Sequence, residues 1–128
     1  MTSPSDAQGR LARSRLARSR LAEDRSETLD RLSGLERERA GIVEATESAN
    51  SDDEHDPEGA TIAFEREHTT ALLERARQHL DEIDAALRRL DEDAYGTCAS
   101  CGEPIAADRL AARPTATTCI RCATHPRP

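Results

Sequence analysis

Two short sequences, Cys98-Ala-Ser-Cys101 and Cys119-Ile-Arg-Cys122, contain all four cysteines of this 128-residue chain and are separated by seventeen residues. Zinc prefers four soft ligands at the corners of a tetrahedron, and two CxxC turns joined by a short loop supply them. Gly102 directly follows the second cysteine, where a tight turn often requires a positive φ. The pattern therefore predicts one structural Zn²⁺ held by Cys98, Cys101, Cys119 and Cys122.

Three other interpretations of the cysteines stay open at this point. Disulfides are typical of secreted proteins, but the chain lacks the apolar stretch that a secretory signal requires. A redox CxxC motif needs a strand followed by a helix, whereas the turn-forming sequence Tyr95-Gly-Thr precedes the first pair. His125 lies three residues after Cys122 and could replace one sulfur as a zinc ligand.

The composition argues against a wide globular core and against several classes of function. Aromatic residues make up 2% of the chain and charged residues 34%. The formal net charge is −7, and four thiolates with one Zn²⁺ would make it two units more negative, so nucleic acid is repelled unless positive charge is concentrated in one place. No run of 18 apolar residues exists, so we expect no membrane span. Residues 1–22 imitate an organelle transit peptide, yet reduced cysteines and the missing export signal favour the cytoplasm.

Apolar residues recur with helical spacing in two long segments. In the first, from Leu21 to about Ala49, they fall within roughly 140° of arc around the helix axis. These first-helix positions are Leu21, Leu29, Leu32, Leu35, Ile42, Val43 and Thr46. In the second segment the spacing alternates strictly between four and three residues, as in a coiled-coil seam. The second-helix positions are Ile62, Arg66, Thr69, Leu73, Ala76, Leu80, Ile83, Leu87, Leu90 and Ala94.

The two expected helices are joined by a short segment of acids and helix breakers at residues 50–59, which include Pro57. A short turn between helices of similar length makes them antiparallel neighbours. The predicted fold is therefore mostly α: a long antiparallel coiled-coil hairpin capped by a small four-cysteine zinc finger. We expect the hairpin at residues 21–94, with an acidic tip at 50–59, and the finger at residues 95–128.

The first 20 residues are expected to form a disordered or frayed basic arm. The sequence Arg-Leu-Ala-Arg-Ser occurs at 10–14 and again at 15–19, so its period is five residues. Each step of five turns about 140° around a helix, which spreads Leu11, Leu16 and Leu21 around the axis instead of onto one buried stripe. Six arginines lie between Arg10 and Arg25.

The expected finger is too small to fold without its metal. Roughly 30 residues cannot bury enough surface for independent stability, so zinc must supply folding free energy. Residues 104–110 resemble a short helix with proline in its first turn, and residues 115–119 are short and β-prone.

The residues from Tyr95 to Cys122, together with a preceding helical hairpin, resemble the DksA/TraR family of bacterial transcription regulators. The similarity is dense over about 30 residues and rests on architecture alone in the hairpin. Nine residues besides the cysteines occupy positions of the family signature: Tyr95, Gly96, Gly102, Ile105, Arg109, Leu110, Ala112, Pro114 and Ala116.

The resemblance implies a partner and a mode of action. Family members insert the hairpin into the secondary channel of RNA polymerase, where the tip approaches the catalytic Mg²⁺, often together with the alarmone ppGpp. The candidate contact residues here are the tip acids, whose oxygen atoms suit Mg²⁺ or an arginine-lined channel, although a merely solvated acidic loop is the alternative. These tip residues are Asp52, Asp53, Asp56 and Glu58.

The tip departs from the family's best-studied pattern, which is Asp-Pro-x-Asp-x-Ala. Alignment on Asp56-Pro57 puts Gly59 at the second aspartate and Thr61 at the alanine. Alignment on Asp53 makes Asp56 the second aspartate but puts Glu58 at the alanine. The fold is therefore expected to carry over, whereas the effect on transcription initiation is expected to be altered or weaker.

Three functions compete. The first is a zinc-binding transcription regulator that acts on RNA polymerase by inserting its hairpin tip into the secondary channel. We expect this regulator to be a monomer without sequence-specific DNA binding. The second is a zinc-capped coiled-coil adaptor that docks on another protein. The third is nucleic-acid binding through the Arg10–Arg25 arm, which lacks stacking aromatics. An enzyme is not expected, because a zinc with four thiolates has no open position for water.

Overall fold

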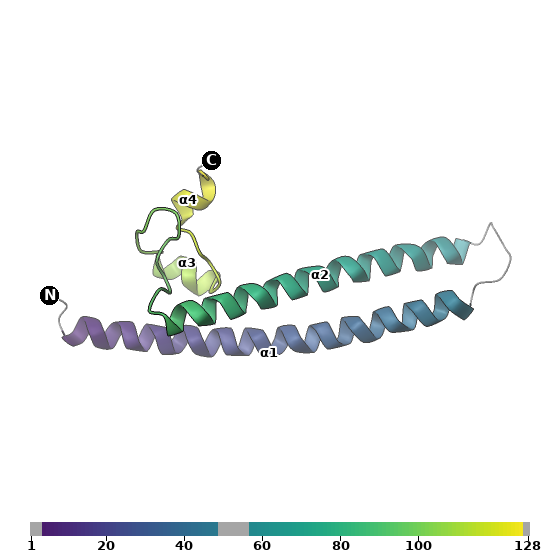
Figure 1. Cartoon of the computed structure of the whole chain (residues 1–128), viewed down its shortest axis with the longest axis horizontal. Helices are drawn as coiled ribbons and strands as arrows, with labels where there is room; N and C mark the ends of the chain where they lie inside the picture. Colours follow the sequence, from purple (N-terminus) through teal and green to yellow (C-terminus); the bar gives the residue numbers. More distant parts are fainter. Residues whose placement is uncertain (1–3, 49–56, 127–128) are drawn as a thin grey trace. The chain divides into compact units, whose positions relative to one another are not determined.

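The computed structural model describes residues 4–48 and 57–126, and these residues form four helices and one isolated antiparallel bridge (Figure 1). The helices are α1 (Pro4–Ser48), α2 (Pro57–Asp91), α3 (Ala107–Ala112) and α4 (Ile120–Thr124). Neither long helix combines the length and the apolar character that crossing a membrane would require. The predicted fold class, a mostly helical chain with an antiparallel helix pair and a four-cysteine finger, is confirmed.

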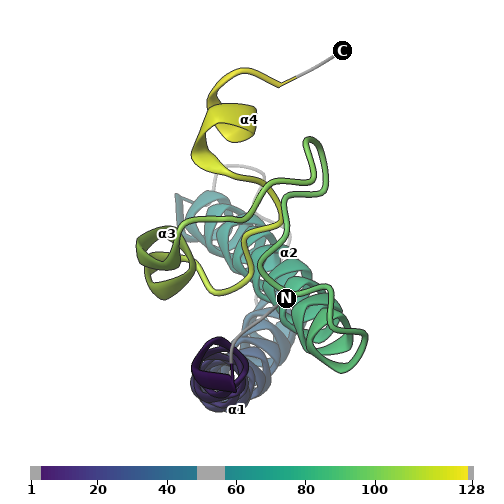
Figure 2. The same ribbon diagram turned by 90° about the vertical axis from the view of Figure 1, so that its left-hand side faces the viewer.

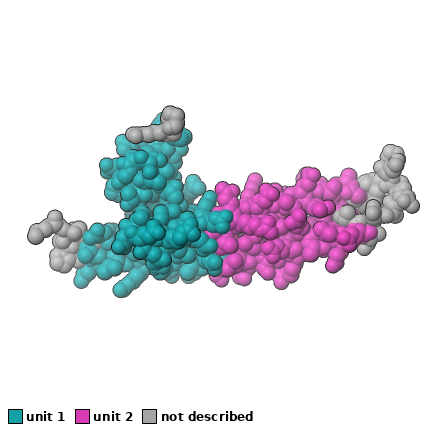
Figure 3. Space-filling model, viewed as in Figure 1, with its two compact units in different colours: residues 1–25, 81–128 teal, residues 26–80 magenta. Residues whose placement is uncertain are grey.

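The chain divides into two compact units, coloured separately in Figure 3. Unit 1 contains residues 1–25 and 81–128, and unit 2 contains residues 26–80. Both units therefore take part of α1 and part of α2. The expected boundary between hairpin and finger, at residue 95, lies inside unit 1. Residues 1–25 and 81–94 of the chain belong to the same unit as the finger.

Unit 2 is held together by apolar side chains between its parts of α1 and α2. Its buried cluster joins Leu32 and Leu35 of α1 to Leu73 and Ala76 of α2, with Leu72 and Leu80 packed against it. Residues further along α1 pack with residues earlier in α2: Leu21 clusters with Ile83 and Ala86, whereas Leu32 and Leu35 cluster with Leu73 and Ala76. The two helices are therefore antiparallel. This is the seam that the alternating three- and four-residue spacing predicted.

One position of the expected seam on α1 is wrong. Thr28 is 6% exposed, whereas the neighbouring Leu29 is 40% exposed. Steps of seven, four and three residues lead from Leu21 through Thr28 to Leu32 and Leu35 and keep one narrow face, and Leu29 lies about 100° away from it. The arc assumed from the sequence was too wide, so it admitted a leucine at its edge. On α2, Arg66 is likewise exposed, while Thr69 is buried as expected.

Unit 1 contains residues 17–25 of α1 and 81–91 of α2. We call this part of the helix pair the base. Its core is formed by Leu21, Ile83, Ala86 and Leu90, with Ala17, Leu87 and Tyr95 packed against it. Two ion pairs flank this core, Arg18–Asp91 at 2.7 Å and Arg25–Asp84 at 2.8 Å. Two of the six arginines near the N-terminus are thus occupied in joining α1 to α2.

The start of α1 falls within the segment expected to be a disordered or frayed arm. The helix begins at Pro4, because proline is tolerated in a first turn and the alanine, leucine and arginine residues that follow are strong helix formers. Leu11 and Leu16 are 58% and 52% exposed, as the five-residue period predicts.

α2 starts and ends earlier than expected. It begins at Pro57, inside the segment expected to be the turn, and ends at Asp91, before the last predicted seam residue, Ala94. Asp93 adopts a positive φ of 56°, and the amide of Ala94 donates to the carbonyl of Arg89 at 2.8 Å. This left-handed turn satisfies a carbonyl at the helix end and directs the chain to Tyr95. Irregular backbone then connects α2 with α3 and α4 (Figure 2).

Candidate metal centre

The first CxxC pair sits on a tight turn stabilised by backbone hydrogen bonds. The amide of Cys98 donates to the carbonyl of Glu103 at 2.8 Å, and the amide of Gly102 donates to the carbonyl of Cys98 at 2.9 Å. Gly102 has the positive φ of 76° that its place after the second cysteine predicted. The neighbouring bridge between Thr97 and Pro104 closes this turn.

A second glycine with a positive φ, Gly96, lies between the first turn and α3. Gly96 has a φ of 85°, and a Cβ at this position would lie 3.4 Å from Cδ1 of Leu110 in α3. The carbonyl of Gly96 accepts a 2.7 Å hydrogen bond from the amide of Ile105, which is itself buried. A Cβ at 3.4 Å would make an ordinary van der Waals contact, so it is the positive φ of Gly96, and not a lack of space, that favours glycine here.

The second CxxC pair is carried by the start of α4. Cys119 is the N-cap residue of α4, and its carbonyl accepts a hydrogen bond from the amide of Ala123 at 2.9 Å. The expected β-prone segment before it makes one link to the first turn, from the amide of Ala99 to the carbonyl of Thr117 at 2.8 Å, and forms no strand. The helix α4 itself was not predicted.

Two signature side chains position the segment that leads to Cys119. The hydroxyl of Tyr95 donates to the carbonyl of Pro114 at 2.7 Å, and Nε of Arg109 donates to the carbonyl of Thr118 at 2.8 Å. The sequence placed both residues in a family signature but gave neither a structural role. Burial raises the pKa of Tyr95. The hydroxyl therefore stays protonated and remains a donor.

The helix α3 corrects a boundary as well. It spans Ala107–Ala112, whereas the sequence predicted a helix over residues 104–110 with Pro104 in its first turn. Pro104 belongs instead to the bridge with Thr97, which holds it in extended backbone. The later start lets Arg109 reach the segment before Cys119.

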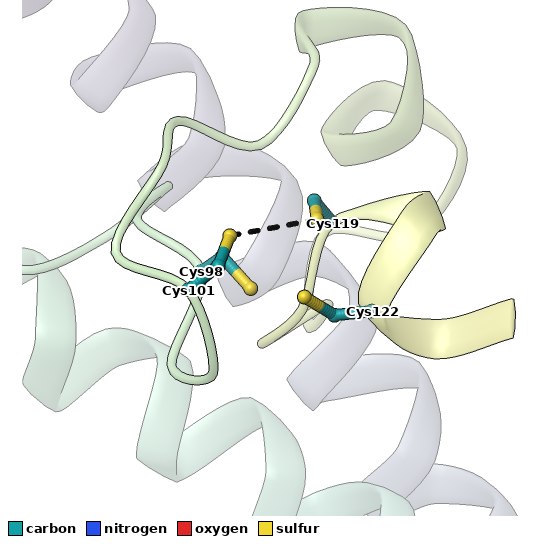
Figure 4. A group of neighbouring side chains, drawn as sticks. All are labelled: Cys98, Cys101, Cys119 and Cys122. Carbon is teal, nitrogen blue, oxygen red and sulfur yellow. Dashed lines mark hydrogen bonds between the residues drawn. The ribbon is translucent and has the colours of Figure 1, made fainter. Parts of the chain in front are cut away.

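The sulfur atoms of Cys98, Cys101, Cys119 and Cys122 converge, as Figure 4 shows. They all lie within 4.8 Å of one another, and Sγ of Cys101 and Sγ of Cys119 are 3.8 Å apart. A tetrahedron with Zn–S bonds of about 2.3 Å has edges of about 3.8 Å, so the cluster fits zinc. A disulfide would bring two sulfurs to about 2.05 Å. All four cysteines are free, and among the described residues His125 is exposed and lies outside the group.

The pKa values of three of the four thiols also suit metal binding. Backbone hydrogen bonds, from Cys119 foremost and then from Cys101, lower the pKa of Cys98 to about 6. A backbone hydrogen bond from Cys122 lowers the pKa of Cys119. The pKa of Cys122 is raised to about 12, chiefly because its thiol is hydrogen-bonded to the side chain of Cys119. The cluster thus holds a proton that a divalent cation would displace.

Most of the predicted tip lies outside the part of the chain that the structure describes. Asp52, Asp53 and Asp56 lie outside the described residues, and Glu58 belongs to the first turn of α2 in unit 2. The cysteines belong to unit 1. The metal centre is structural, because four thiolates leave no position for a reacting water.

Comparison with protein families agrees with this centre. The family model described as the prokaryotic dksA/traR C4-type zinc finger matches residues 94–124. This range contains all four cysteines together with Tyr95 and Arg109.

Similarity to individual proteins extends beyond the finger. The RNA polymerase-binding transcription factor DksA of Haemophilus influenzae is 42% identical over 71 residues, which cover 53% of this chain and 49% of that protein. The protein of the same name in Escherichia coli is 39% identical over 64 residues, 48% of this chain and 42% of that protein. The chain thus spans about half, or less, of the curated relatives it matches.

A solved structure matches over most of the chain. It is that of transcription factor DksA2 from Pseudomonas aeruginosa, with 35% sequence identity and a TM-score of 0.75. The match covers 88% of this chain and 81% of that one. The likeness therefore includes the helix pair as well as the finger.

Proposed function

The chain belongs to the DksA/TraR family, and from this premise we propose that it is a DksA-like transcription factor that binds RNA polymerase. The observation that carries the proposal is the four-cysteine cluster in one compact unit with the base of an antiparallel helix pair. Relatives that this chain matches are named RNA polymerase-binding transcription factors. The zinc would stabilise the finger, and the helix pair would provide the contact surface.

The proposed mode of action is insertion of the hairpin into the secondary channel, with Asp52, Asp53, Asp56 and Glu58 at its end. Residues 26–80 hold fourteen acidic residues and six arginines, a formal charge of −8 that exceeds the −7 of the whole chain. This charge suits a channel lined by basic residues. Because the tip departs from the family pattern, we propose an altered or weaker effect on initiation.

The proposal also covers the partners that the family implies. The chain would act as a monomer without catalytic activity of its own, and ppGpp is a candidate co-regulator. An adaptor unrelated to polymerase is not favoured by the names of the relatives. Nucleic-acid binding through the N-terminal arginines is also less favoured, because Arg18 and Arg25 already form ion pairs with Asp91 and Asp84.

Site-specific crosslinking tests the proposed insertion. A photoreactive side chain at the exposed Ala60 of α2 should crosslink to residues that line the secondary channel, whereas one at the exposed Ile120 of α4 should not enter it. A parallel transcription assay compares the wild type with Asp53→Ala/Asp56→Ala, with and without ppGpp. Crosslinks from Ala60 only to the outer surface of polymerase would refute insertion while leaving binding intact.

A further inference from the structure

A groove opens between α1 and α2 within unit 2. It has a volume of about 400 Å³, enough for a long side chain. Of its lining residues, Thr69 is buried, Ile42 and Ile62 are half-buried, and the rest are exposed. The lining residues are Glu38, Gly41, Ile42, Ala45, Ile62, Glu65, His68 and Thr69.

Two small residues of α1 line the groove on either side of the half-buried Ile42. Gly41 has no Cβ, and a Cβ built there would have no neighbour within 4 Å. Ala45, one turn further on, is also small. The same two helices are fully packed where Leu35 meets Leu73, so the opening is local to this stretch.

An exposed aromatic ring stands beside the groove. Phe64, the chain's single phenylalanine, is 70% exposed. Its ring stacks on His68, with centroids 6.4 Å apart and an interplanar angle of 1°. Because His68 lines the groove, the ring of Phe64 extends the rim outward. A large exposed aromatic contributes little to the stability of the free protein and is typical of a contact surface.

The charged groups of the groove specify its occupant. The two carboxylates in the lining belong to Glu38 and Glu65, and no lysine or arginine is among the lining residues. Neither glutamate forms an ion pair with another described residue. The unit around them carries a formal charge of −8. Two half-buried isoleucines, two carboxylates and a neighbouring aromatic ring together suit an arginine, whose stem is apolar and whose guanidinium pairs with carboxylates and stacks on rings.

We propose that this groove docks an arginine side chain of RNA polymerase, an inference that rests on the proposed function. The arginine stem lies against Ile42 and Ile62, and its guanidinium pairs with Glu38 and Glu65 beside the ring of Phe64. The groove adds to the acidic tip a second contact on the helix pair, formed by residues of both helices.

Equilibrium binding to purified core polymerase tests the proposal. Glu38→Gln/Glu65→Gln should weaken binding about tenfold or more and reduce its dependence on salt, because a guanidinium is left without its carboxylates. Phe64→Ala should also weaken binding, and Gly41→Leu should do so by filling the groove. Circular dichroism should show that all variants keep the helical fold.

Matched controls separate the groove from general effects. Glu67→Gln removes an exposed acid of α2 that does not line the groove, and Ala40→Leu places a leucine at an exposed position beside Gly41. Both should bind like the wild type. Suppose that the wild type binds polymerase. The proposal is then overturned if Glu67→Gln weakens binding as much as Glu38→Gln/Glu65→Gln does, or if the groove variants bind like the wild type. If the wild type sediments as a dimer and Gly41→Leu abolishes that dimer, the groove is occupied by a second copy of this chain. That result would also overturn the proposal. Failure of the wild type to bind refutes the proposed function itself.

Discussion

Tyr95 joins the zinc finger to the base of the helix pair, and its two attachments can be removed separately. Its ring packs against the core of Leu21, Ile83, Ala86 and Leu90, and its hydroxyl donates to the carbonyl of Pro114 at 2.7 Å. Tyr95→Phe removes the hydrogen bond and keeps the ring. Tyr95→Ala removes both.

The structure sets the expected sizes of these effects. Loss of one hydrogen bond to a half-exposed carbonyl costs about 1 kcal/mol, because water can satisfy part of the lost contact. Removal of a fully buried aromatic ring costs about 3–5 kcal/mol, and Tyr95 is half-buried, so roughly 2 kcal/mol more is expected. The free energy of unfolding should fall by about 1 kcal/mol in Tyr95→Phe and by about 3 kcal/mol in Tyr95→Ala.

Urea unfolding of the zinc-loaded protein, followed by circular dichroism, measures both values. Transfer of zinc to a chromogenic chelator adds a readout of the finger, and zinc should leave faster from both variants. Ile120→Ala, at a side chain that is 67% exposed in the same unit, is the control and should change stability by less than about 0.5 kcal/mol. Equal stability of Tyr95→Phe and Tyr95→Ala would refute the packing role of the ring, and no difference between Tyr95→Phe and the wild type would refute the role of the hydroxyl.

Three further predictions concern the metal and the helices. Removal of zinc by a chelator should unfold residues 95–126 but leave most of the circular dichroism of α1 and α2, because the cluster of Leu32, Leu35, Leu73 and Ala76 does not depend on the metal; complete loss of helix would contradict this. Zinc affinity should fall as the pH is lowered, and more steeply below about 6, where the Cys98 thiol also becomes protonated in the zinc-free protein. Calorimetry in buffers of different ionisation enthalpy should show that zinc binding releases protons. Binding without proton release would mean that the thiols were already ionised. Gly34→Ala and Gly41→Ala should each stabilise the protein by about 1 kcal/mol in thermal or urea unfolding, because a Cβ at either site meets no atom within 4 Å; destabilisation would mean that the helices pack more closely there.

The features that the sequence predicted correctly are those set by local spacing. Two CxxC turns bring four sulfurs together because each pair needs only its own tight turn, and Gly102 has the positive φ expected there. The seam of α2 follows from a strict alternation of three and four residues, so Leu73 and Ile83 are buried as predicted.

The features that were missed depend on contacts between distant residues. The helix α3 starts at Ala107 because Pro104 pairs with Thr97, and the segment before α4 is held by Tyr95 and Arg109. Hydrophobic spacing carries no signal for such bonds. Ala86 is fully buried although it fell outside the expected seam, because it faces Leu21 in the base.

The central claim is that this zinc-stabilised helix pair binds RNA polymerase. The most direct measurement is the equilibrium affinity of the purified, zinc-loaded chain for core polymerase, with Asp53→Ala/Asp56→Ala measured in parallel. The account predicts saturable binding at micromolar or lower concentration, weakened by the double substitution. Absence of binding at micromolar protein would contradict it.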